Sequence, residues 1–402
     1  MDSNNKVVVV VGAGPVGLIT ALGLARAGVE VVVLEREPAL VASPRAIVYY
    51  GGVLGGLEQL GLLDDTLKAG VKSTTVQFLV HRTGERIAFD HEVLEGRVPY
   101  PYNVNLGQDR MAEIALRHLL RLPGTEVRFG TTVNGLEQDA DGVTVIGDAN
   151  GVPVRLRAGW VVGADGASSR VRELLGLDFE GTTWPERFVA TNVRFPYDRH
   201  GFADANMVID QQYGAVIAKI DDSGLWRCTY SEDAALPVET VHERIPEYFA
   251  ATLPGDQRYG LVRYSPYKMH QRAASAFRSG RVVLAGDAAH VTNPTGGLGL
   301  TSGLFDSFVL SEALAAVVRG ETGAEVLDRY AEDRRRVFQE YASPVASALK
   351  HLVFNCPDEN VLEEALAGLR QAAADPELRA GRLMISQPLQ TPSLLTPVTP
   401  AG

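Results

Sequence analysis

Three glycines near the N-terminus have the spacing of a phosphate-binding turn. They are Gly12, Gly14 and Gly17. In such a turn the first glycine bends the chain, the second lets a pyrophosphate approach the backbone, and the third lets a helix pack on a strand. An acid about 20 positions further on accepts hydrogen bonds from a ribose, and Glu35 stands 18 residues after Gly17. The spacing predicts a dinucleotide site, and the carboxylate favours FAD or NAD over NADP, although the cationic Arg36 follows it.

The elements that this turn requires are present on both sides of it. Residues 7–11 are five valines, a run typical of a parallel strand buried on both faces. Residues 18–27 have a helical pattern that ends at Gly28, and 29–34 form a second apolar run. Strand, turn, helix, strand and acid thus follow in the order of a βαβ unit, with a phosphate at the free N–H groups of the helix start.

A second glycine-rich stretch places one carboxylate and one histidine at the end of a buried strand. Residues 281–303 read RVVLAGDAAHVTNPTGGLGLTSG. The apolar run 282–285 predicts the strand, Gly286 and Asp287 the turn after it, and Thr301 the start of a long helix. Open α/β sheets bind ligands at the carboxyl ends of their strands, so we expect this stretch to line the same site.

A third strand end carries an acid and a glycine. The apolar run from 160 leads to Asp165 and Gly166, and then to a short helix with Ser169 and Arg172. An Asp-Gly pair at a strand end is often only a turn, so a turn and a ligand site are both open here.

Two further polar residues have open alternatives. Arg45 could face a pyrophosphate or a nicotinamide cofactor, or it could be a solvated surface residue. Gln108 precedes an amphipathic helix, where its amide could reach a ligand or could cap the helix.

The composition is that of an ordinary globular enzyme with more than one core. The chain has 402 residues, of which 46% are hydrophobic and 22% charged. A net charge of −11 without a basic run argues against nucleic acid as a partner. Cys228 and Cys356 are far apart, which predicts free thiols in a reducing cytoplasm and no metal site. We recognise no signal peptide and no run of ~18 apolar residues, so we expect no membrane span.

The residue pattern divides the chain. Between 187 and 275, alternating stretches such as FVATNVRF and LWRCTY predict antiparallel strands with one solvated face. We therefore expect a dinucleotide-binding domain (1–180 and 276–340), a substrate-binding sheet domain (181–275), C-terminal helices (341–385) and a flexible tail (386–402). The first domain would contain strands at 76–80 and 86–89 and an inserted meander at 126–129, 132–139, 142–146 and 155–158.

Side chains on the inner face of the second domain would contact the substrate. The candidates are Gln211, Tyr213, Trp226 and Cys228. Ordinary cross-strand packing is the alternative for each of them.

Three separated motifs in one order are more specific than any one alone. They are GAGPVGL…LERE, GADGASSRVR and RVVLAGDAAHVTNPTGGLGLTSGLFDS, within residues 6–320. Together they resemble the class A flavin-dependent aromatic hydroxylases, the para-hydroxybenzoate hydroxylase family. The resemblance implies an α/β fold with a Rossmann-like FAD-binding domain of the glutathione-reductase type, an interleaved antiparallel substrate sheet and C-terminal helices. It implies an NAD(P)H-dependent FAD monooxygenase that uses O₂, through a C4a-hydroperoxyflavin, to hydroxylate a phenolic, N-heteroaromatic or polycyclic ring.

The resemblance assigns FAD binding to residues of all three motifs and to two residues between them. This set is Gly12, Gly14, Pro15, Val16, Gly17, Glu35, Arg36, Arg45, Gln108, Asp165, Gly166, Arg172, Gly286, Asp287, Pro294, Gly297, Leu298, Gly299, Leu300 and Thr301. Asp287 would bind the ribityl chain, and Pro294, Gly296 and Gly297 would shape the face where oxygen reacts. The family usually has Asn where this chain has Thr301. A threonine can still cap a helix, so we expect flavin binding to persist with altered hydrogen bonding.

The sequence leaves the catalytic base and the substrate open. A phenol with a pKa near ~10 calls for a base. His270, His290 and Tyr213 are candidates, and His290 could instead support the turn at Asp287. NAD(P)H would bind only transiently because a second glycine motif is missing. The alternatives are a flavin oxidase or reductase without oxygen transfer and a silent flavin-binding protein. A flavin-dependent halogenase would need a GWxWxIP-like loop, and the sequence contains no such stretch. A homodimer is compatible with the sequence.

Overall fold

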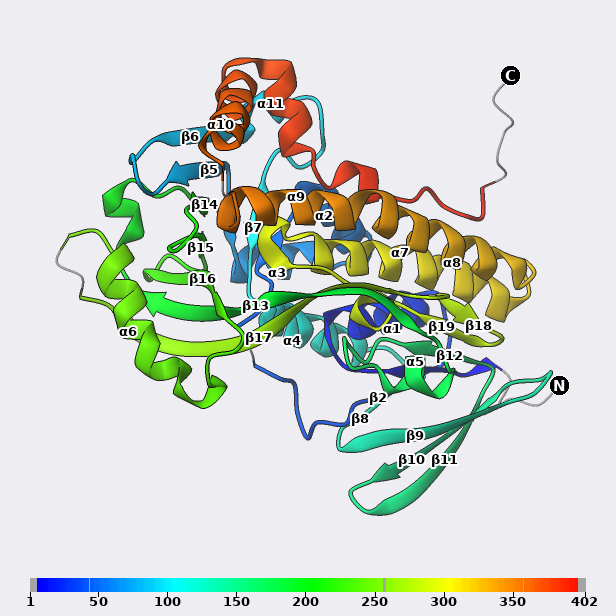
Figure 1. The fold of residues 1–402 in the computed structure, drawn as a ribbon. Helices are drawn as coiled ribbons and strands as arrows, with labels where there is room; N and C mark the ends of the chain where they lie inside the picture. The colour runs from blue at the N-terminus through cyan, green and yellow to red at the C-terminus, as the bar shows by residue number, and fades with distance from the viewer. Residues whose placement is uncertain (1–5, 43, 256–257, 357, 397–402) are drawn as a thin grey trace.

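The computed structural model describes residues 6–42, 44–255, 258–356 and 358–396, and two large sheets organise them. The first sheet has the strand order β18-β19-β12-β1-β2-β8 (Figure 1). Its neighbours pair in parallel except for β18 and β19. The strands are β1 (Val8–Val11), β2 (Val31–Leu34), β8 (Thr125–Arg128), β12 (Trp160–Gly163), β18 (Arg278–Ser279) and β19 (Val282–Leu284). The predicted α/β architecture is confirmed.

Both faces of this sheet are covered, which explains the valine run of β1. Val8 and Val10 pack with three helices on one face. Val9 and Val11 pack on the other face with α5 (Arg170–Leu174) and a three-stranded sheet. The three helices are α1 (Pro15–Arg26), α4 (Gln108–Leu119) and α7 (Leu298–Arg319). A strand buried on both sides has no polar face, so its residues are apolar without alternation.

The three-stranded sheet is the predicted meander with one strand fewer. Its strands are β9 (Thr131–Gln138), β10 (Val143–Ala149) and β11 (Val152–Ala158). The strand expected at 126–129 is β8, which pairs in parallel with β2 at the edge of the first sheet. That expectation was wrong because strand partners are set by contacts distant in sequence.

The second large sheet has the order β20-β17-β13-β16-β15-β14-β5-β6. Its strands are β5 (Thr75–Val80), β6 (Arg86–Asp90), β13 (Phe179–Arg194), β14 (Ala205–Ile209), β15 (Ala215–Lys219), β16 (Leu225–Asp233), β17 (Gly260–Ala274) and β20 (His290–Val291). The strands expected at 76–80 and 86–89 thus belong to this sheet, through the parallel pairing of β5 with β14, and this corrects their placement in the first domain. Figure 1 shows the long strands β13 and β17 reaching from α6 (Val241–Thr252) back toward β18 and β19.

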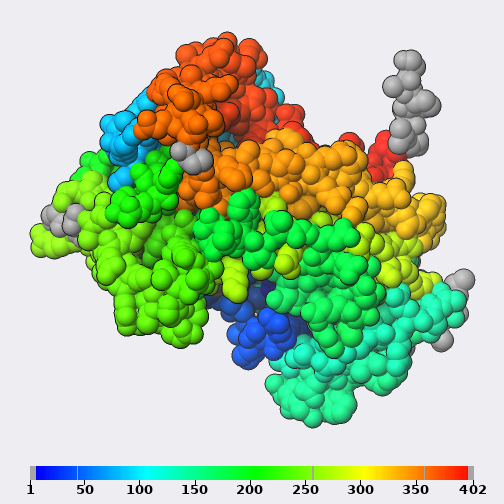
Figure 2. All heavy atoms as spheres, in the orientation of Figure 1, coloured from blue at the N-terminus to red at the C-terminus, as the bar shows by residue number. Residues whose placement is uncertain are grey.

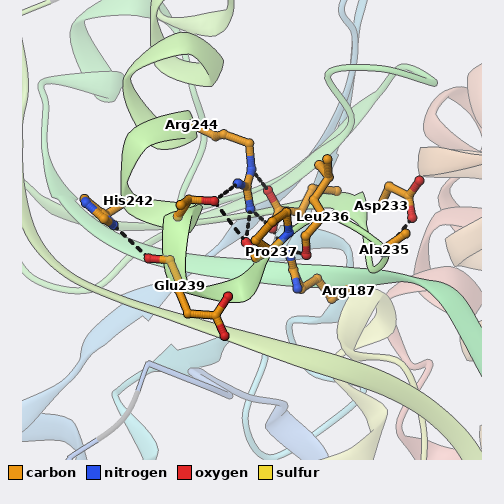
Figure 3. Close-up of polar contacts among 10 residues, drawn as sticks. Arg187, Asp233, Ala235, Leu236, Pro237, Glu239, His242 and Arg244 are labelled. Atoms are coloured by element: carbon orange, nitrogen blue, oxygen red, sulfur yellow. Dashed lines mark hydrogen bonds and ion pairs between the residues drawn. The ribbon is translucent and has the colours of Figure 1, made fainter.

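A buried carboxylate closes the α6 end of this sheet. Glu232 accepts hydrogen bonds from Arg187 at 2.6 Å and from Arg244 at 2.9 Å. The same two arginines donate to the carbonyls of Leu236 and Pro237, so they also hold the loop before α6 (Figure 3). The buried Glu232 carboxylate is thus paired with two cations, whose remaining N–H groups donate to two backbone carbonyls.

A small sheet and short helices connect the two large sheets. The small sheet pairs β3 (Val48–Tyr49) and β4 (Val71–Ser73) with β7 (Asn103–Asn105). The chain between β3 and β4 forms two helices, α2 (Gly51–Gln59) and α3 (Leu63–Ala69), with a turn at Gly61 between them.

The C-terminal part is helical. The helices are α8 (Glu325–Val337), α9 (Ser343–Phe354), α10 (Glu359–Ala374) and α11 (Pro376–Leu383). A π-turn, Phe338–Ala342, joins α8 to α9 just before Pro344. The wider turn accommodates a proline that cannot donate to the helical ladder.

The expected flexible tail is corrected over its first part. Leu389 lies in the short 3₁₀ helix Gln387–Leu389 and is fully buried. Arg334 donates to the Leu389 carbonyl at 2.6 Å and to Thr391 Oγ1 at 3.0 Å. One buried leucine and one buried guanidinium hold this Pro- and Thr-rich segment on the core, and 397–402 lie outside the described residues.

Among the described helices, α7 is long and apolar enough to cross a membrane by length and composition alone. Of its most apolar window, 78% is buried inside the protein. A central helix of a folded core has the same composition, and the packing of α7 against α1 gives it that place.

Candidate active site

The glycine turn leaves the start of α1 free for an anion. Gly14 is the N-cap, no side chain caps the helix, and a Cβ at Gly14 would meet no atom within 4 Å. Gly12 has φ +109°, and a Cβ there would lie 2.3 Å from the Ala164 carbonyl oxygen. A Cβ at Gly17 would lie 2.1 Å from the Gly12 carbonyl oxygen. The first and third glycines are thus required by close packing, and the second faces open space in which a phosphate fits.

Glu35 holds the glycine turn. Its carboxylate accepts the N–H of Ala13 at 2.7 Å and the N–H of Glu37 at 2.9 Å. Arg36 is exposed and lies 3.4 Å from the Glu37 carboxylate. The acid at the end of β2 therefore fixes the turn as well as being placed for a ribose.

Asp165 caps α5. Its carboxylate accepts Ser169 Oγ at 2.5 Å and the backbone N–H groups of Arg170 at 2.7 Å and Val171 at 3.1 Å. Asp165 and its neighbour Gly166 adjoin the glycine turn, because the hypothetical Cβ of Gly12 would lie 2.9 Å from the Asp165 Cα. The structure thus shows the turn alternative, with Asp165 beside the glycine turn.

Arg172 joins the second motif to the third. It is buried and donates to the carbonyl oxygens of Ala288 and Ala167, both at 2.9 Å. Its guanidinium lies 3.7 Å from the centre of the Phe179 ring. With these contacts made, Arg172 positions the turn around Asp287 and has little left for a ligand.

Asp287 presents its carboxylate to an accessible space inside the protein. The residue is exposed although Gly286 and Ala288 beside it are buried. Desolvation raises the pKa of its carboxyl, and the charge of Arg45 opposes that rise. An accessible carboxylate among buried neighbours is the arrangement that a polar cofactor chain requires.

Arg45 and Gln108 stand at the edges of the same region. Arg45 is exposed, and its charge reaches Asp287. Gln108 is the first residue of α4 and half-buried, while the N-cap is Gly107. On the face shown in Figure 2, the blue segment around residue 45 lies between residues near α6 and the three-stranded sheet.

His290 belongs to a buried triad. Its Nε2 lies 2.7 Å from Asp306 Oδ2, and Arg334 Nε donates to Asp306 Oδ1 at 2.7 Å. Asp306 also accepts the N–H of Gly286 at 2.9 Å. Burial alone would raise the pKa of Asp306, but His290 and Arg334 lower it to about 2. The histidine predicted as a catalytic candidate is fully buried and supports the turn at Asp287, the alternative open in the sequence.

The loop at Pro294 is a single 3₁₀ turn, Pro294–Gly296. The Tyr50 hydroxyl donates to the Gly296 carbonyl at 2.7 Å. Gly297, with φ 64°, is the N-cap of α7, and no side chain caps that helix. The backbone N–H groups of Leu298, Gly299 and Leu300 in its first turn therefore have no helical partner.

Thr301 does not begin α7. The helix begins one turn earlier at Leu298, and Thr301 Oγ1 donates back to the Gly297 carbonyl at 2.8 Å. The expected cap at Thr301 was wrong because the left-handed backbone of Gly297 already ends the loop. The buried hydroxyl instead braces the first turn.

The four predicted substrate residues lie elsewhere. Trp226 and Cys228 are buried in a cluster with α6, and Tyr213 packs against that cluster. Gln211 Nε2 donates to the Cys356 carbonyl at 2.6 Å. All four thus make the ordinary packing or hydrogen-bond contacts that the sequence left open as the alternative. Trp226 and Cys228 lie on the face of β16 that packs on α6, opposite Arg227, and Gln211 and Tyr213 lie in the turn between β14 and β15.

Arg227 is the β16 side chain that contacts the segment around Arg45. It is buried, donates from Nε to Asn192 Oδ1 at 2.6 Å, and donates from Nη1 to the Arg45 carbonyl. Burial lowers its pKa to about 10. No described carboxylate forms an ion pair with it. The sequence analysis missed Arg227, and the one available signal was its place between two apolar residues of the same strand.

The contacts of the other two candidate bases, His270 and Tyr213, do not mark either of them as the catalytic base. His270 lies 2.8 Å from Thr183 Oγ1, and burial lowers its pKa. Tyr213 lies in the turn after β14, beside His81. Over the described ranges, His, Cys, Asp and Glu form no group of three that could hold a metal ion.

The arrangement fits FAD. The start of α1 can hold a pyrophosphate, Asp287 a polyol and the start of α7 an anionic ring edge. All three lie at carboxyl ends of strands or at the helices that follow them.

Comparisons with known proteins agree with this site. Residues 5–343 match the FAD binding domain family. The 6-hydroxy-3-succinoylpyridine 3-monooxygenase HspB of Pseudomonas putida (strain DSM 28022 / S16) is 48% identical over 354 residues, which are 88% of this chain and 90% of that protein. The para-nitrophenol 4-monooxygenase of Pseudomonas sp. (strain WBC-3) is 43% identical over 95% of this chain and 98% of its own.

Solved structures give the same result. The p-nitrophenol 4-monooxygenase PnpA from Pseudomonas putida DLL-E4 superposes with a TM-score of 0.92 at 42% identity, covering 96% of this chain and 98% of its own. Aklavinone-11 hydroxylase, solved with FAD and aklavinone, has a TM-score of 0.79 at 29% identity, covering 89% of this chain and 70% of its own.

Proposed function

The chain belongs to the family of FAD-dependent aromatic hydroxylases, and on that premise we propose that its substrate is an anionic hydroxyarene with a substituent para to the hydroxyl. The enzyme is a monooxygenase that uses FAD, with NAD(P)H as reductant, O₂ and a small aromatic substrate. Bound FAD supplies the reduction of O₂ and the transfer of one oxygen atom to the ring. Everything below concerns what the protein contributes.

The names of two relatives support this class. One acts on para-nitrophenol at position 4, and the other acts on 6-hydroxy-3-succinoylpyridine at position 3. In each name, the oxygenated position is the one that bears the substituent, para to the hydroxyl. We propose the same ring position for this enzyme.

Arg227 is the observation that carries the anionic character. A buried guanidinium without a described carboxylate partner stabilises a negative ligand. An electron-withdrawing para substituent lowers the pKa of a phenol below its ordinary value of ~10, so the substrate enters as an anion. A substrate that is already ionised does not need a dedicated base, and none stands out here.

The geometry supports proposed roles toward the cofactor. We propose that the free N–H groups after Gly14 hold the pyrophosphate and that Asp287 accepts the ribityl hydroxyls. The unsatisfied N–H groups of Leu298, Gly299 and Leu300 stabilise the negative charge that develops on the pyrimidine edge of the ring. Gly296 and Gly297 keep the oxygen face free of a Cβ.

The test is substrate-stimulated NAD(P)H oxidation by the FAD-loaded enzyme. We expect para-nitrophenol to stimulate oxidation more than meta-nitrophenol or nitrobenzene. The oxygen should replace the nitro group, so one nitrite is released per ring and the product has the mass of the benzoquinone, while the second oxygen atom of O₂ leaves as water. Equal stimulation by the meta isomer would contradict the para class. NAD(P)H oxidation without an oxygenated product would instead favour a flavin oxidase or reductase.

Two wider expectations remain proposals. We propose a cytoplasmic location, which two free cysteines, one of them buried, support. We also propose that the enzyme works apart from membranes and nucleic acid and forms a homodimer. Cell fractionation and light scattering test these statements.

A further inference from the structure

Gln271 on β17 is the centre of a hydrogen-bond network beside the Pro294 loop. Its Oε1 accepts Thr292 Oγ1 at 3.0 Å, the Asn293 N–H at 3.1 Å and Asn293 Nδ2 at 3.2 Å. Its Nε2 donates to Thr292 Oγ1 and Ser343 Oγ, both at 2.8 Å, and to the Ser343 carbonyl at 3.1 Å. One side chain thus joins the eight-stranded sheet, the loop and the start of α9.

The network continues into the 3₁₀ turn. Asn293 is fully buried, and its Oδ1 accepts the Thr295 N–H at 3.2 Å. Two side-chain amides in succession therefore link β17 to the turn at Pro294. On the far side of the turn, the Tyr50 hydroxyl holds the Gly296 carbonyl.

The other polar contacts of the turn lie at its C-terminal end, where the Gly297 N–H donates to the Pro294 carbonyl at 3.0 Å and Thr301 Oγ1 donates to the Gly297 carbonyl at 2.8 Å. Pro294 has no N–H, the turn spans three residues, and Gly297 at its end is a flexible residue type. Leu349 of α9 backs it, since a Cβ at Gly296 would lie 3.0 Å from Leu349 Cδ1. Gln271 also holds the start of α9, so the same amide fixes the turn and the helix behind it.

We propose that Gln271 is a positioning residue that fixes the Pro294 loop and thereby couples NAD(P)H oxidation to hydroxylation of the ring. This inference rests on the proposed role of that loop at the oxygen face of FAD. A misplacement of about 1 Å in a reacting geometry costs up to ~10²-fold in rate. A loosened loop leaves the cofactor bound but lets reduced oxygen escape as hydrogen peroxide.

The experiment uses three full-length, FAD-loaded variants. Gln271→Met keeps the length of the side chain and removes every hydrogen bond. Gln271→Glu keeps the acceptor bonds to Thr292 and Asn293 and loses the donor bonds. Gln77→Met is the matched control, because Gln77 is a buried amide on β5 of the same sheet.

We expect Gln271→Met to retain FAD within about twofold and to yield about tenfold less hydroxylated product per NAD(P)H oxidised, the balance being hydrogen peroxide. In the FAD-free proteins, amide hydrogen exchange of 290–297 should be about tenfold faster in this variant than in wild type. Gln271→Glu should recover part of the coupling, and Gln77→Met should match wild type in both measurements.

Wild-type coupling and exchange in Gln271→Met would overturn the inference, and so would equal losses in Gln77→Met. Loss of FAD from Gln271→Met alone would also overturn it, because the residue would then serve cofactor retention. A wild-type protein that binds no FAD would instead overturn the role of the loop on which the inference rests.

Discussion

Asp287 is the side chain that we propose for binding the ribityl chain of FAD. Its carboxylate is accessible among buried neighbours, and no described side chain donates to it, so its hydrogen-bonding capacity is free for a polyol. We predict that Asp287→Ala lowers the FAD content of the purified enzyme at least about tenfold, because losing even one hydrogen bond to a charged group costs about 1.5–3 kcal/mol. Absorbance near 450 nm per protein measures it.

The control for that prediction is Asp178→Ala, since Asp178 is also exposed but lies after α5. This variant should keep its flavin. Full flavin content in Asp287→Ala would remove the ribityl assignment.

Asp306 gives the enzyme an acid-sensitive link. Burial would raise its pKa, but His290 and Arg334 lower it to about 2, below the ordinary value of ~3.9. A carboxyl whose pKa is lower in the folded than in the unfolded state stabilises the fold above about pH 4 and loses that effect toward pH 2. Beyond His290 and Arg334, the carboxyl of Asp287 and the uncharged hydroxyl of Tyr330 also face Asp306.

We therefore predict that the Asp306→Asn substitution lowers the free energy of unfolding by an amount that depends on pH. The loss should be about 2 kcal/mol larger at pH 5 than at pH 2. Urea unfolding at a series of pH values measures the difference. A gap that is constant over this range would show that the charge of Asp306 does not contribute.

At the scale of elements, α9 is tied to β13 by a buried cation. Lys350 is fully buried and lies 3.1 Å from Glu186 Oε2, 2.6 Å from Asn355 Oδ1 and 4.0 Å from the centre of the Trp184 ring. Desolvation lowers the pKa of its ammonium. This contact fixes the helix whose Leu349 backs the Pro294 turn.

We predict that Lys350→Met lowers the free energy of unfolding by about 3 kcal/mol, because Glu186 then stays partly buried without its cation. The double variant Lys350→Met/Glu186→Gln should regain much of this loss, and Lys268→Met, at an exposed position of β17, should change little. Denaturant unfolding measures these free energies. A double variant that is no more stable than Lys350→Met would contradict a stabilising Lys350–Glu186 ion pair.

For the whole molecule, the segment after α11 is a strap across the helices. It runs past α7 and α8 in Figure 1, and its Leu389 side chain is fully buried. We predict that Leu389→Ala costs about 2–5 kcal/mol in free energy of unfolding, as for other buried leucines. Thermal and denaturant unfolding measure it.

Leu395→Ala is the matched control, since Leu395 is 38% exposed on the same segment. Its effect should stay within about 0.5 kcal/mol. Equal effects of the two substitutions would restore the flexible tail that the composition predicted.

Local sequence determined the FAD-binding half of this enzyme. Glycine spacing, a valine run and one acid specify a βαβ unit within 35 residues, because steric limits at Gly12 and hydrogen bonds at Glu35 act over short range. The turn at Asp287 was predictable for the same reason. The family and the chemistry followed from three such motifs in order.

Only the tertiary structure decided which side chains face the substrate and what supports the loops. Apolar residues at alternate positions of a strand predict two different faces, but they do not predict which face packs on a helix and which lies toward a cofactor. The packing of α6 buries Trp226, and the opposite face of β16 brings Arg227 to the Arg45 carbonyl. Gln271, Asp306 and Arg334 contact partners that are 72, 20 and 55 positions away in the sequence, respectively. Their roles are set by which segments meet in space, and that is a property of the folded chain rather than of any local pattern.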